Sequence, residues 1–484
     1  MWEENLLSQL RSRYAPRRRR RQDSGTSKAS KRARKIPVPA DEYADPDRIS
    51  SLPDNVLRHT LSFLDTKYAV ATSVLSTRWK DLCISLPNIV LDDSLTFLKR
   101  KKNFEKAFEK FACKQIVLRN VPNINHFRLK CNFIEDSTIG DIVCAAICCK
   151  VKEVDLWMGD STTVGILPLE LFVCHSLVVL KLRAAVELFV WESVSLPNLK
   201  VLHLVDFMLD GDRSMNRLFR GCKFLEELCL SRCSFGNNRV LNLSFPCSEN
   251  FLSIMVMVIF MDFLGDGNAK CKLGIDAPNL EIFEYHCHEN EFHLVNNLDS
   301  LVRAKISFIS KLKNWGNVSE LFNKMYGVKS LYLSESALEV MYSNRSSLSV
   351  FETLTFLELR AFDLRMLPSI LERAPQLEEL VVHKHGFDAE AEVLYTLPET
   401  VPVCLTEHIR NIEFKKFIGS ELDFELVKYL LQNGKVLKRM KIAGLGQSTS
   451  DLSTSTCKKI SMFPRCSETI EIMFEYDDNL EFSR

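Results

Sequence analysis

A short apolar phrase recurs along the chain from about residue 115. Clear copies of the L-x-x-L-x-L type are Leu177–Leu182, Leu199–Leu204, Leu225–Leu230, Leu280–Tyr285, Leu354–Leu359 and Leu377–Val382, and looser copies begin at Val151, Phe251, Leu301 and Val328. Successive copies start 21 to 29 residues apart. Because successive side chains of a strand point to opposite faces, the last two apolar residues of each copy, two positions apart, face the same way, and each copy predicts one strand.

This period is typical of leucine-rich repeats, in which each unit donates one strand to a parallel sheet. One unit cannot cover its own apolar face, but stacked units bury a continuous core. The strand residues between the leucines are then expected on the concave surface: Trp157, Lys181, Arg183, His203, Ile282, His286, Arg303, Lys305, Tyr332, Phe356, Arg360 and His383.

Mixed aromatic and basic residues on that surface suit a protein ligand or an acidic small molecule. The alternative is that they are ordinary strand residues, because aromatic side chains are favoured in sheets anyway. We expect a target-binding surface there, and its candidate contacts are Arg183, His203, Tyr332 and Phe356.

Three short helices are predicted before the repeats. Pro53 and Asp54 suit the start of the first helix, and Val56, Leu57, Leu61 and Leu64 form its one-sided apolar stripe. The second helix carries Val70, Val74 and Leu75, and the third starts at Ser76 and presents Trp79 and Leu82. Helices this short cannot bury all these side chains among themselves, so some of the apolar surface is expected to face a partner.

These helices carry a specific resemblance. The segments Asp47–Leu57, Leu61–Leu64 and Ala71–Lys80 resemble the plant F-box, a family that binds the Skp-family adaptor of SCF ubiquitin ligases and, through it, a cullin. The resemblance implies that seven residues pack in or near that interface: Leu52, Pro53, Leu57, Leu61, Leu64, Leu75 and Trp79. Cys83 stands where the family often has a second Trp, and the lost aromatic area is expected to weaken docking.

The C-terminal block has its own pattern. Val401–Leu405 and Ile409–Phe414 open it, an amphipathic helix is predicted over Glu425–Gly434, and a strand follows at 435–442. Together with the turn Phe463–Cys466, this block resembles the FBD domain at the end of many plant F-box/leucine-rich proteins. It is expected to cap the last apolar face of the solenoid.

Composition and charge narrow the possible partners. The chain has 484 residues, of which 46% are hydrophobic and 26% charged. Its longest apolar stretch, Phe251–Leu264, is too short for a bilayer span and contains Asp262. Residues 1–40 hold 12 Lys/Arg and 3 Asp/Glu, so the remaining residues are mildly acidic although the formal net charge is +1. We therefore expect neither a membrane nor a nucleic acid as partner.

The basic residues of the N-terminal segment form two clusters, one at 17–21 and one at 31–35. This spacing suits a bipartite nuclear import signal. Its predicted residues are Arg20, Arg21, Lys31, Arg32, Arg34 and Lys35. The alternative is a generic solvated tail, or one that binds RNA weakly, so the expected location is the nucleus, the cytoplasm or both.

Residues that commonly carry catalysis or bind metal do not form a pattern. The 16 cysteines are scattered, and neither Cys144, Cys148 and Cys149 nor His286, Cys287 and His288 has a second ligand pair at zinc-like spacing. The sequence has no Gly-rich phosphate loop, G-x-S-x-G elbow or H-E-x-x-H motif. We therefore expect a non-catalytic protein with no cofactor and no metal.

These observations predict an α/β chain: a basic tail at 1–44, a three-helix F-box at 45–92, a leucine-rich-repeat solenoid at 110–395 with its parallel sheet on the concave face, an α/β FBD-like cap at 396–475 and a tail at 476–484. The predicted function is that of the substrate-recognition subunit of an SCF-type ubiquitin ligase, whose repeats bind an unidentified target protein. The alternative is a repeat scaffold whose F-box no longer joins a ligase.

Overall fold

The computed structural model describes residues 48–93, 104–117, 123–132, 136–159, 167–209, 211–235, 240–245, 253–258, 271–287, 290–294, 298–308, 316–344, 346, 348–361, 364–384, 400–444 and 450–475. The predicted import signal, the tail at 476–484 and most of Phe251–Leu264 lie outside these residues. The chain divides into two compact units, residues 1–177 and 178–484, which are described in turn.

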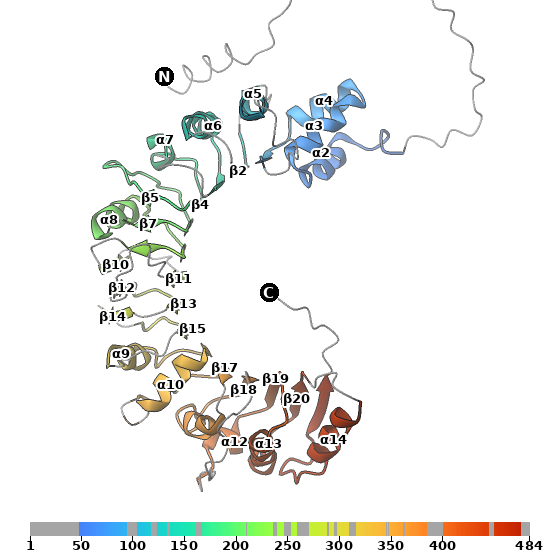
Figure 1. Cartoon of the computed structure of the whole chain (residues 1–484), viewed down its shortest axis with the longest axis vertical. Helices are drawn as coiled ribbons and strands as arrows, with labels where there is room; N and C mark the ends of the chain where they lie inside the picture. The colour runs from blue at the N-terminus through green and yellow to red at the C-terminus, as the bar shows by residue number, and fades with distance from the viewer. Residues whose placement is uncertain are drawn as a thin grey trace, which may run out of the picture. The chain divides into compact units, whose positions relative to one another are not determined.

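The first unit opens with the predicted helices, α2 (Asp54–Ser62), α3 (Thr66–Ala71) with the 3-10 turn η1 (Thr72–Val74), and α4 (Thr77–Ile84) (Figure 1). Their shared core is Leu57, Leu61, Ala69, Trp79, Leu82 and Leu86. Asp54, in the first turn of α2, also accepts a hydrogen bond of 2.8 Å from Nε of Arg78. The same guanidinium donates to the backbone oxygens of Ser50 and Leu52, so Arg78 connects α4 to the chain that enters α2.

The rest of the first unit combines helices with a parallel sheet. Its strands are β1 (Asn88–Asp92), β2 (His126–Cys131) and β3 (Glu153–Met158), and its helices are α5 (Phe104–Val117), α6 (Asp136–Cys148) and α7 (Leu169–Phe172). The carboxylate of buried Asp93, just after β1, accepts hydrogen bonds from the backbone and side-chain nitrogens of Asn132, just after β2. Strand β1 therefore already belongs to the sheet, although the repeats were predicted to start only at residue 110.

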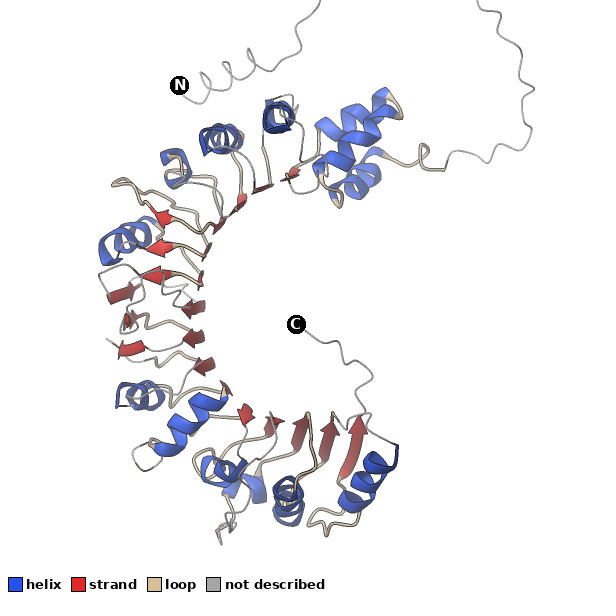
Figure 2. Ribbon diagram, viewed as in Figure 1, coloured by secondary structure: helices blue, strands red, loops and turns tan. Residues whose placement is uncertain are grey.

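The second unit contains a longer parallel sheet. Its strands follow chain order: β4 (Val179–Arg183), β6 (Val201–Val205), β8 (Glu227–Ser231), β11 (Ser253–Val258), β13 (Ile282–Cys287), β15 (Arg303–Phe308), β16 (Ser330–Leu333), β17 (Phe356–Ala361), β18 (Glu379–Lys384), β19 (Asn411–Lys415), β20 (Arg439–Ala443) and β21 (Glu471–Glu475). Within this unit the strands line the inner side of the curve and the helices cover the outer side (Figure 2). The predicted fold class is confirmed.

The outer side of the second unit changes along its length. It carries two small parallel sheets, one formed by β5 (Glu187–Leu188), β7 (Met208–Leu209) and β9 (Ser234–Phe235) and the other by β10 (Val240–Ser244), β12 (Cys271–Asp276) and β14 (Asn290–Leu294). Its helices are α8 (Gly211–Gly221), α9 (Gly316–Lys324), α10 (Glu335–Ser343), α11 (Leu367–Leu371) after the 3-10 turn η2 (Leu364–Met366), α12 (Val403–Glu407), α13 (Glu421–Asn433) and α14 (Ser450–Ser461).

The repeated leucines form one continuous row across this sheet. In register from strand to strand lie Leu180, Leu202, Leu228, Ile254, Phe283, Ala304, Leu331, Leu357, Leu380, Ile412 and Met440. Each of them is at most 1% exposed. The period seen in the sequence is therefore the period of a shared core, in which every unit covers its neighbours.

The predicted cap extends the sheet. Strands β19 to β21 continue the parallel order beyond β18, and α12 to α14 cover them on the outer side (Figure 1). Helix α13 begins at Glu421, four residues before the predicted start, because Ser420 and Asp423 form a capping box there. Gly434 ends the helix as predicted, and a Cβ at this position would lie 2.8 Å from the Leu430 carbonyl oxygen.

A buried ion pair ties the cap to the last repeat. Nζ of Lys384, at the end of β18, lies 2.6 Å from Oδ1 of Asp423 on α13, and both side chains are at most 3% exposed. Lys384 also donates to Oγ of Ser420, while Oδ2 of Asp423 accepts from the backbone nitrogens of Gly419 and Ser420. The charges and polar atoms removed from water are thus satisfied by one another, which a buried pair requires.

Replacing Lys384 with Met should lower the free energy of unfolding by about 3–5 kcal/mol, because the buried Asp423 carboxylate loses its cation. Replacing Asp423 with Ala should lower the free energy of unfolding by a similar amount. The double variant should lose less free energy of unfolding than the two single variants lose together. Chemical denaturation of the four proteins measures this coupling. The exposed pair Arg410–Glu378 is the matched control, where Arg410→Met should cost at most about 1 kcal/mol. If the losses at Lys384 and Asp423 were additive, the two side chains would not be coupled as a buried ion pair.

Candidate functional site

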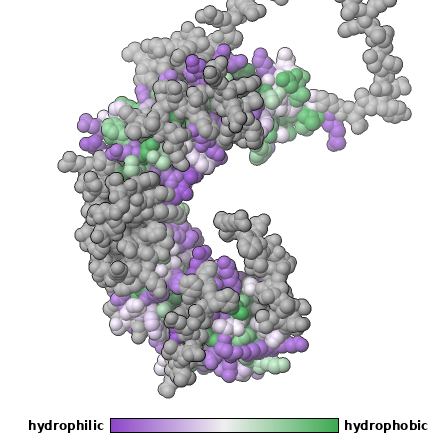
Figure 3. All heavy atoms as spheres, viewed as in Figure 1, coloured by the Kyte–Doolittle hydropathy of each residue, from purple (hydrophilic) through white to green (hydrophobic). Residues whose placement is uncertain are grey.

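Two surfaces are candidates for function, an apolar surface on the N-terminal helices and a polar hollow on the inner face of the second unit. The apolar surface lies around α2, η1 and the start of α4, where hydrophobic side chains gather at the surface (Figure 3). The most exposed are Val74 at 85%, Phe63 at 76% and Leu75 at 64%. Ile49, Leu52, Leu64 and Tyr68 are also exposed.

The seven predicted adaptor contacts fall into two groups. Leu52, Pro53, Leu64 and Leu75 lie on the surface, whereas Leu57, Leu61 and Trp79 are buried in the helical core. Leu57 and Leu61 are one turn apart and face inward, so the apolar stripe of α2 is divided between the core and the surface. Leu57, Leu61 and Trp79 support the surface residues from the core and are not themselves accessible to a partner. Phe63 and Val74 are more exposed than Leu52, Leu64 and Leu75 but are not among the seven; Val74 was predicted only as an apolar residue of the second helix.

Cys83 lies beneath this surface, on α4. Its Sγ donates to the backbone oxygen of Ala69 at 2.8 Å and lies 3.4 Å from Oγ1 of Thr72. Burial raises the pKa of this thiol above its ordinary value, although the hydrogen bond with Thr72 opposes the shift. The thiol therefore joins α4 to the end of α3 in its neutral form. Its expected effect on docking stays a prediction.

Most charges on the inner face of the second unit are paired with a neighbouring strand. Arg183 lies 2.9 Å from Asp206, which Arg232 also contacts, and His203 lies 2.6 Å from Glu227. Burial alone would raise the pKa of Asp206, but hydrogen bonds and the charges of the two arginines lower it below its ordinary value. Two of the four predicted target contacts, Arg183 and His203, are therefore already engaged within the chain.

The other two predicted contacts lie side by side. The rings of Tyr332 on β16 and Phe356 on β17 are tilted to each other with centroids 5.3 Å apart. Both side chains are partly buried, and Tyr332 also lines the hollow. These two rings give the inner face an aromatic contact surface next to a recess.

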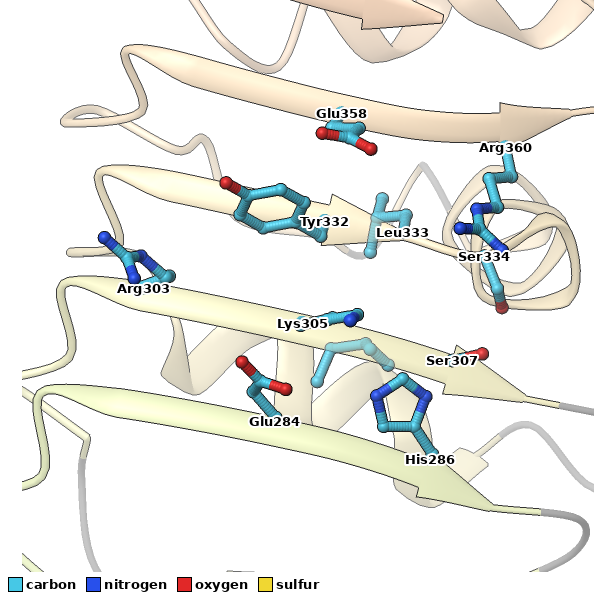
Figure 4. Close-up of a pocket in the computed structure, with 11 residues that line it drawn as sticks. Glu284, His286, Arg303, Lys305, Ser307, Tyr332, Leu333, Ser334, Glu358 and Arg360 are labelled. Carbon is cyan, nitrogen blue, oxygen red and sulfur yellow. The ribbon is translucent and has the colours of Figure 1, made fainter. Parts of the chain in front are cut away.

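The hollow has a volume of about 340 Å³ and is formed by β13, β15, β16, β17 and the start of α10 (Figure 4). It exists because Ser307 and Ser334 are small and lie between the larger His286 and Arg360. The Ser334 hydroxyl is engaged in the wall, since it accepts from the backbone nitrogen of Phe308 at 3.0 Å and caps α10. The floor of the hollow is thus held in place by the helix behind it.

The charges around the hollow are unevenly paired. Glu358 lies 2.8 Å from Nε2 of His383, at the rim. Lys305 and Arg360 both line the hollow, and in the described part of the chain neither has a carboxylate within ion-pair distance. Glu284 and Arg303 complete the charged lining.

The pKa of His286 reports this environment. Burial lowers it below its ordinary value, the positive charges of Lys305 and Arg360 lower it further, and the negative charge of Glu284 opposes them. His286 is therefore neutral at pH 7, with one ring nitrogen available as a donor and the other as an acceptor. The arrangement of Lys305, Arg360 and a neutral imidazole can bind an anion.

Among the described residues, no group of three His, Cys, Asp or Glu side chains is placed to hold a metal ion. Buried Cys148 and Cys149 lie near the end of α6, and Cys144 donates to Glu170 at 3.7 Å. No helix in the part of the chain that the structure describes is long and apolar enough to cross a membrane.

Comparisons with known proteins match three family models. The F-box domain matches residues 49–91, the repeats described as "FBD-associated F-box protein At5g56370, LRR repeats" match 143–382, and FBD matches 397–442. The apolar surface lies on the first of these regions. The hollow lies within the second.

Similar proteins come from Arabidopsis thaliana. The F-box/FBD/LRR-repeat protein At5g22660 is 29% identical over 88% of this chain and 96% of its own length. The probable FBD-associated F-box protein At1g32375 is 27% identical over 89% of this chain and 100% of its own length. The putative F-box/LRR-repeat protein At4g00320 is 30% identical over 79% of this chain and 80% of its own length.

His286 should titrate below the ordinary histidine pKa of 6.5. Replacing Lys305 or Arg360 with Met should raise its pKa, because each change removes a nearby positive charge, but not to 6.5, because burial remains. NMR of histidine ring carbons in the intact chain, assigned with a His286→Asn variant, measures this. Lys329→Met, an exposed change outside the hollow, is the control. An unchanged pKa in both variants would show that the charges do not act on His286.

Proposed function

Because this chain belongs to the family of F-box/FBD/LRR-repeat proteins, we propose that it is the substrate-recognition subunit of an SCF-type ubiquitin ligase. The N-terminal helices dock a Skp-family adaptor, and through it a cullin. The repeats hold a target protein for ubiquitination. The chain itself is a non-catalytic adaptor.

The observation that carries this proposal is the exposed apolar surface of the F-box helices. F-box domains generally bind Skp-family adaptors. Phe63, Leu64, Val74 and Leu75 remain accessible although Leu57 and Leu61 beside them are buried. Complete burial of a large apolar side chain is worth roughly 1.5–3 kcal/mol, so a few of them are enough to anchor a partner. Such a surface is costly to leave in water and is typical of an interaction site.

The aromatic surface formed by Tyr332 and Phe356, together with the hollow, supports target binding by the repeats. Interfaces concentrate their energy in a few aromatic and arginine anchors surrounded by weaker contacts. Tyr332, Phe356 and Arg360 provide such side chains on adjacent strands. Arg183 and His203 contribute less in this proposal, because a target would have to displace Asp206 and Glu227 from them.

The alternative is a repeat scaffold that does not join a ligase. Cys83 in place of the family's frequent Trp is the feature that favours it. The thiol packs inside the helical group with Ala69 and Thr72, and the exposed apolar surface is present above it. We therefore favour the ligase subunit, and adaptor binding separates the two functions.

Replacing both Leu64 and Leu75 with Ala should weaken binding of the full chain to a Skp-family adaptor by at least 30-fold, because two exposed anchors are removed. Isothermal titration calorimetry measures this, and the melting temperature should not change. The control is Met462→Ala, an apolar residue after α14 that is 81% exposed and lies outside the F-box helices. Trp79→Ala should instead unfold the helices, because Trp79 is in their core. Failure of the unaltered chain to bind the adaptor would favour the scaffold.

We also propose that residues 1–44 direct the protein to the nucleus, on the strength of the two basic clusters. This segment, fused to a reporter too large to diffuse through nuclear pores, should accumulate in the nucleus. Changing Lys31, Arg32, Arg34 and Lys35 to Ala should abolish accumulation, because the import receptor would lose the second cluster. Fluorescence microscopy gives the nuclear-to-cytoplasmic ratio. A reporter that stays cytoplasmic with the intact segment contradicts the proposal.

A further inference from the structure

We propose that the hollow on β13, β15, β16 and β17 is a binding site for a phosphate monoester group. The group lies between Lys305 and Arg360, over the small side chains of Ser307 and Ser334, with His286 beside it (Figure 4). This site concerns the repeats alone and does not depend on whether the chain joins a ligase.

The first argument is charge. Along this face carboxylates accompany most cations, as in the Arg183–Asp206, His203–Glu227 and Lys441–Glu413 pairs. Lys305 and Arg360 lie in the same recess without such a partner among the described residues. Two cations held near each other repel, and a ligand with two negative charges relieves that repulsion. A phosphate monoester carries about −1.5 to −2 charges at pH 7.

The second argument is geometry. Lys305 comes from β15 and Arg360 from β17, so the two cations approach the recess from strands on either side of β16. Figure 4 shows both side chains turned toward the serine end of the hollow. A planar carboxylate offers two oxygens and is satisfied by one arginine fork, whereas a tetrahedral phosphate offers three oxygens in different directions. The phosphate can therefore contact both cations at once.

The third argument is the supply of further donors. Ser307 lines the serine end of the hollow, and its hydroxyl has no hydrogen-bond partner in the described part of the chain. The hydroxyl of Tyr332 is turned toward the opposite end, beside Arg303 (Figure 4). Neutral His286 keeps one N–H donor. A volume of about 340 Å³ accommodates a phosphate with some of its water, since a water molecule takes roughly 30 Å³ of liquid.

The two lining carboxylates limit what else can bind. Glu284 and Glu358 lie with Lys305 and Tyr332 in one row of aligned strand positions, and His286 and Arg360 lie toward the other end of the hollow. The carboxylates of Glu284 and Glu358 repel a second anion, so the site is suited to a single phosphate on a larger molecule. A long polyanion would meet these carboxylates as soon as it extended beyond the recess.

The test uses the intact chain without any adaptor, and the ring signal of His286 as a local probe. Inorganic phosphate should shift this signal and raise the pKa of His286, whereas acetate at the same concentration and ionic strength should not. Lys305→Met and Arg360→Met should each weaken the phosphate response at least tenfold at unchanged melting temperature. Arg360→Lys should retain part of it, and the exposed Lys329→Met is the matched control. A response to acetate as strong as to phosphate, no response, or one that survives both Met variants would overturn the proposal.

A second measurement distinguishes the source of the phosphate. A degenerate pool of peptides with a central phosphoserine is compared with the same pool carrying glutamate and with free phosphoserine, by competition for the His286 signal. Binding of the phosphopeptide pool at least tenfold tighter than free phosphoserine supports a phosphorylated side chain of a protein. Equal binding of the phosphopeptide pool and free phosphoserine supports a small phosphorylated molecule as the ligand. Equal binding of the glutamate and phosphoserine pools would mean that the recess recognises any anion, which contradicts the proposal.

Discussion

No single repeat of this chain can bury the apolar face of its own strand, and the fold of the second unit follows from that constraint. Leu202 and Leu357 are buried only because the strands on either side of each carry apolar residues in register. Parallel stacking with a constant register is the arrangement that covers each face in turn. It also aligns the intervening side chains in rows on the inner face, which is what brings distant positions of the sequence together.

A terminal repeat of such an array has no neighbour to cover its outer apolar face. At the C-terminal end, strands β19 to β21 continue the sheet, and the buried Lys384–Asp423 pair joins this extension to the preceding repeat. The same carboxylate caps α13, so one interaction orders both the helix and its attachment. In the first unit, the F-box helices form their own core and leave Phe63 and Val74 exposed. The second unit is thus closed at its C-terminal end by the chain itself, whereas the F-box helices of the first unit leave apolar side chains at their surface.

The inner face combines two kinds of polar surface. Where neighbouring strands supply opposite charges, as at Arg183 and Asp206, the side chains bind one another. A ligand would have to break such a pair before it could bind either charge. Where β15 and β17 supply Lys305 and Arg360 without a carboxylate between them, positive charge is left in a recess. Recognition in this family member is therefore expected at the unpaired part of the face. The aromatic pair of Tyr332 and Phe356 lies at its edge.

The sequence by itself determined the repeat period, the inward leucines, the three N-terminal helices and the class of the C-terminal block, because each depends on local periodicity or on a short motif. It also placed His286, Lys305 and Arg360 on the inner face, since alternation along a strand is a local property. Only the tertiary structure decided that Leu57, Leu61 and Trp79 are core while Leu64 and Leu75 are surface, because burial depends on which helices pack together. It likewise decided that Arg183 and His203 are paired, whereas Lys305 and Arg360 have no carboxylate partner among the residues that the structure describes. Partners such as Asp206 and Glu227 are more than 20 residues away in the sequence, and only the register of neighbouring strands brings them into contact.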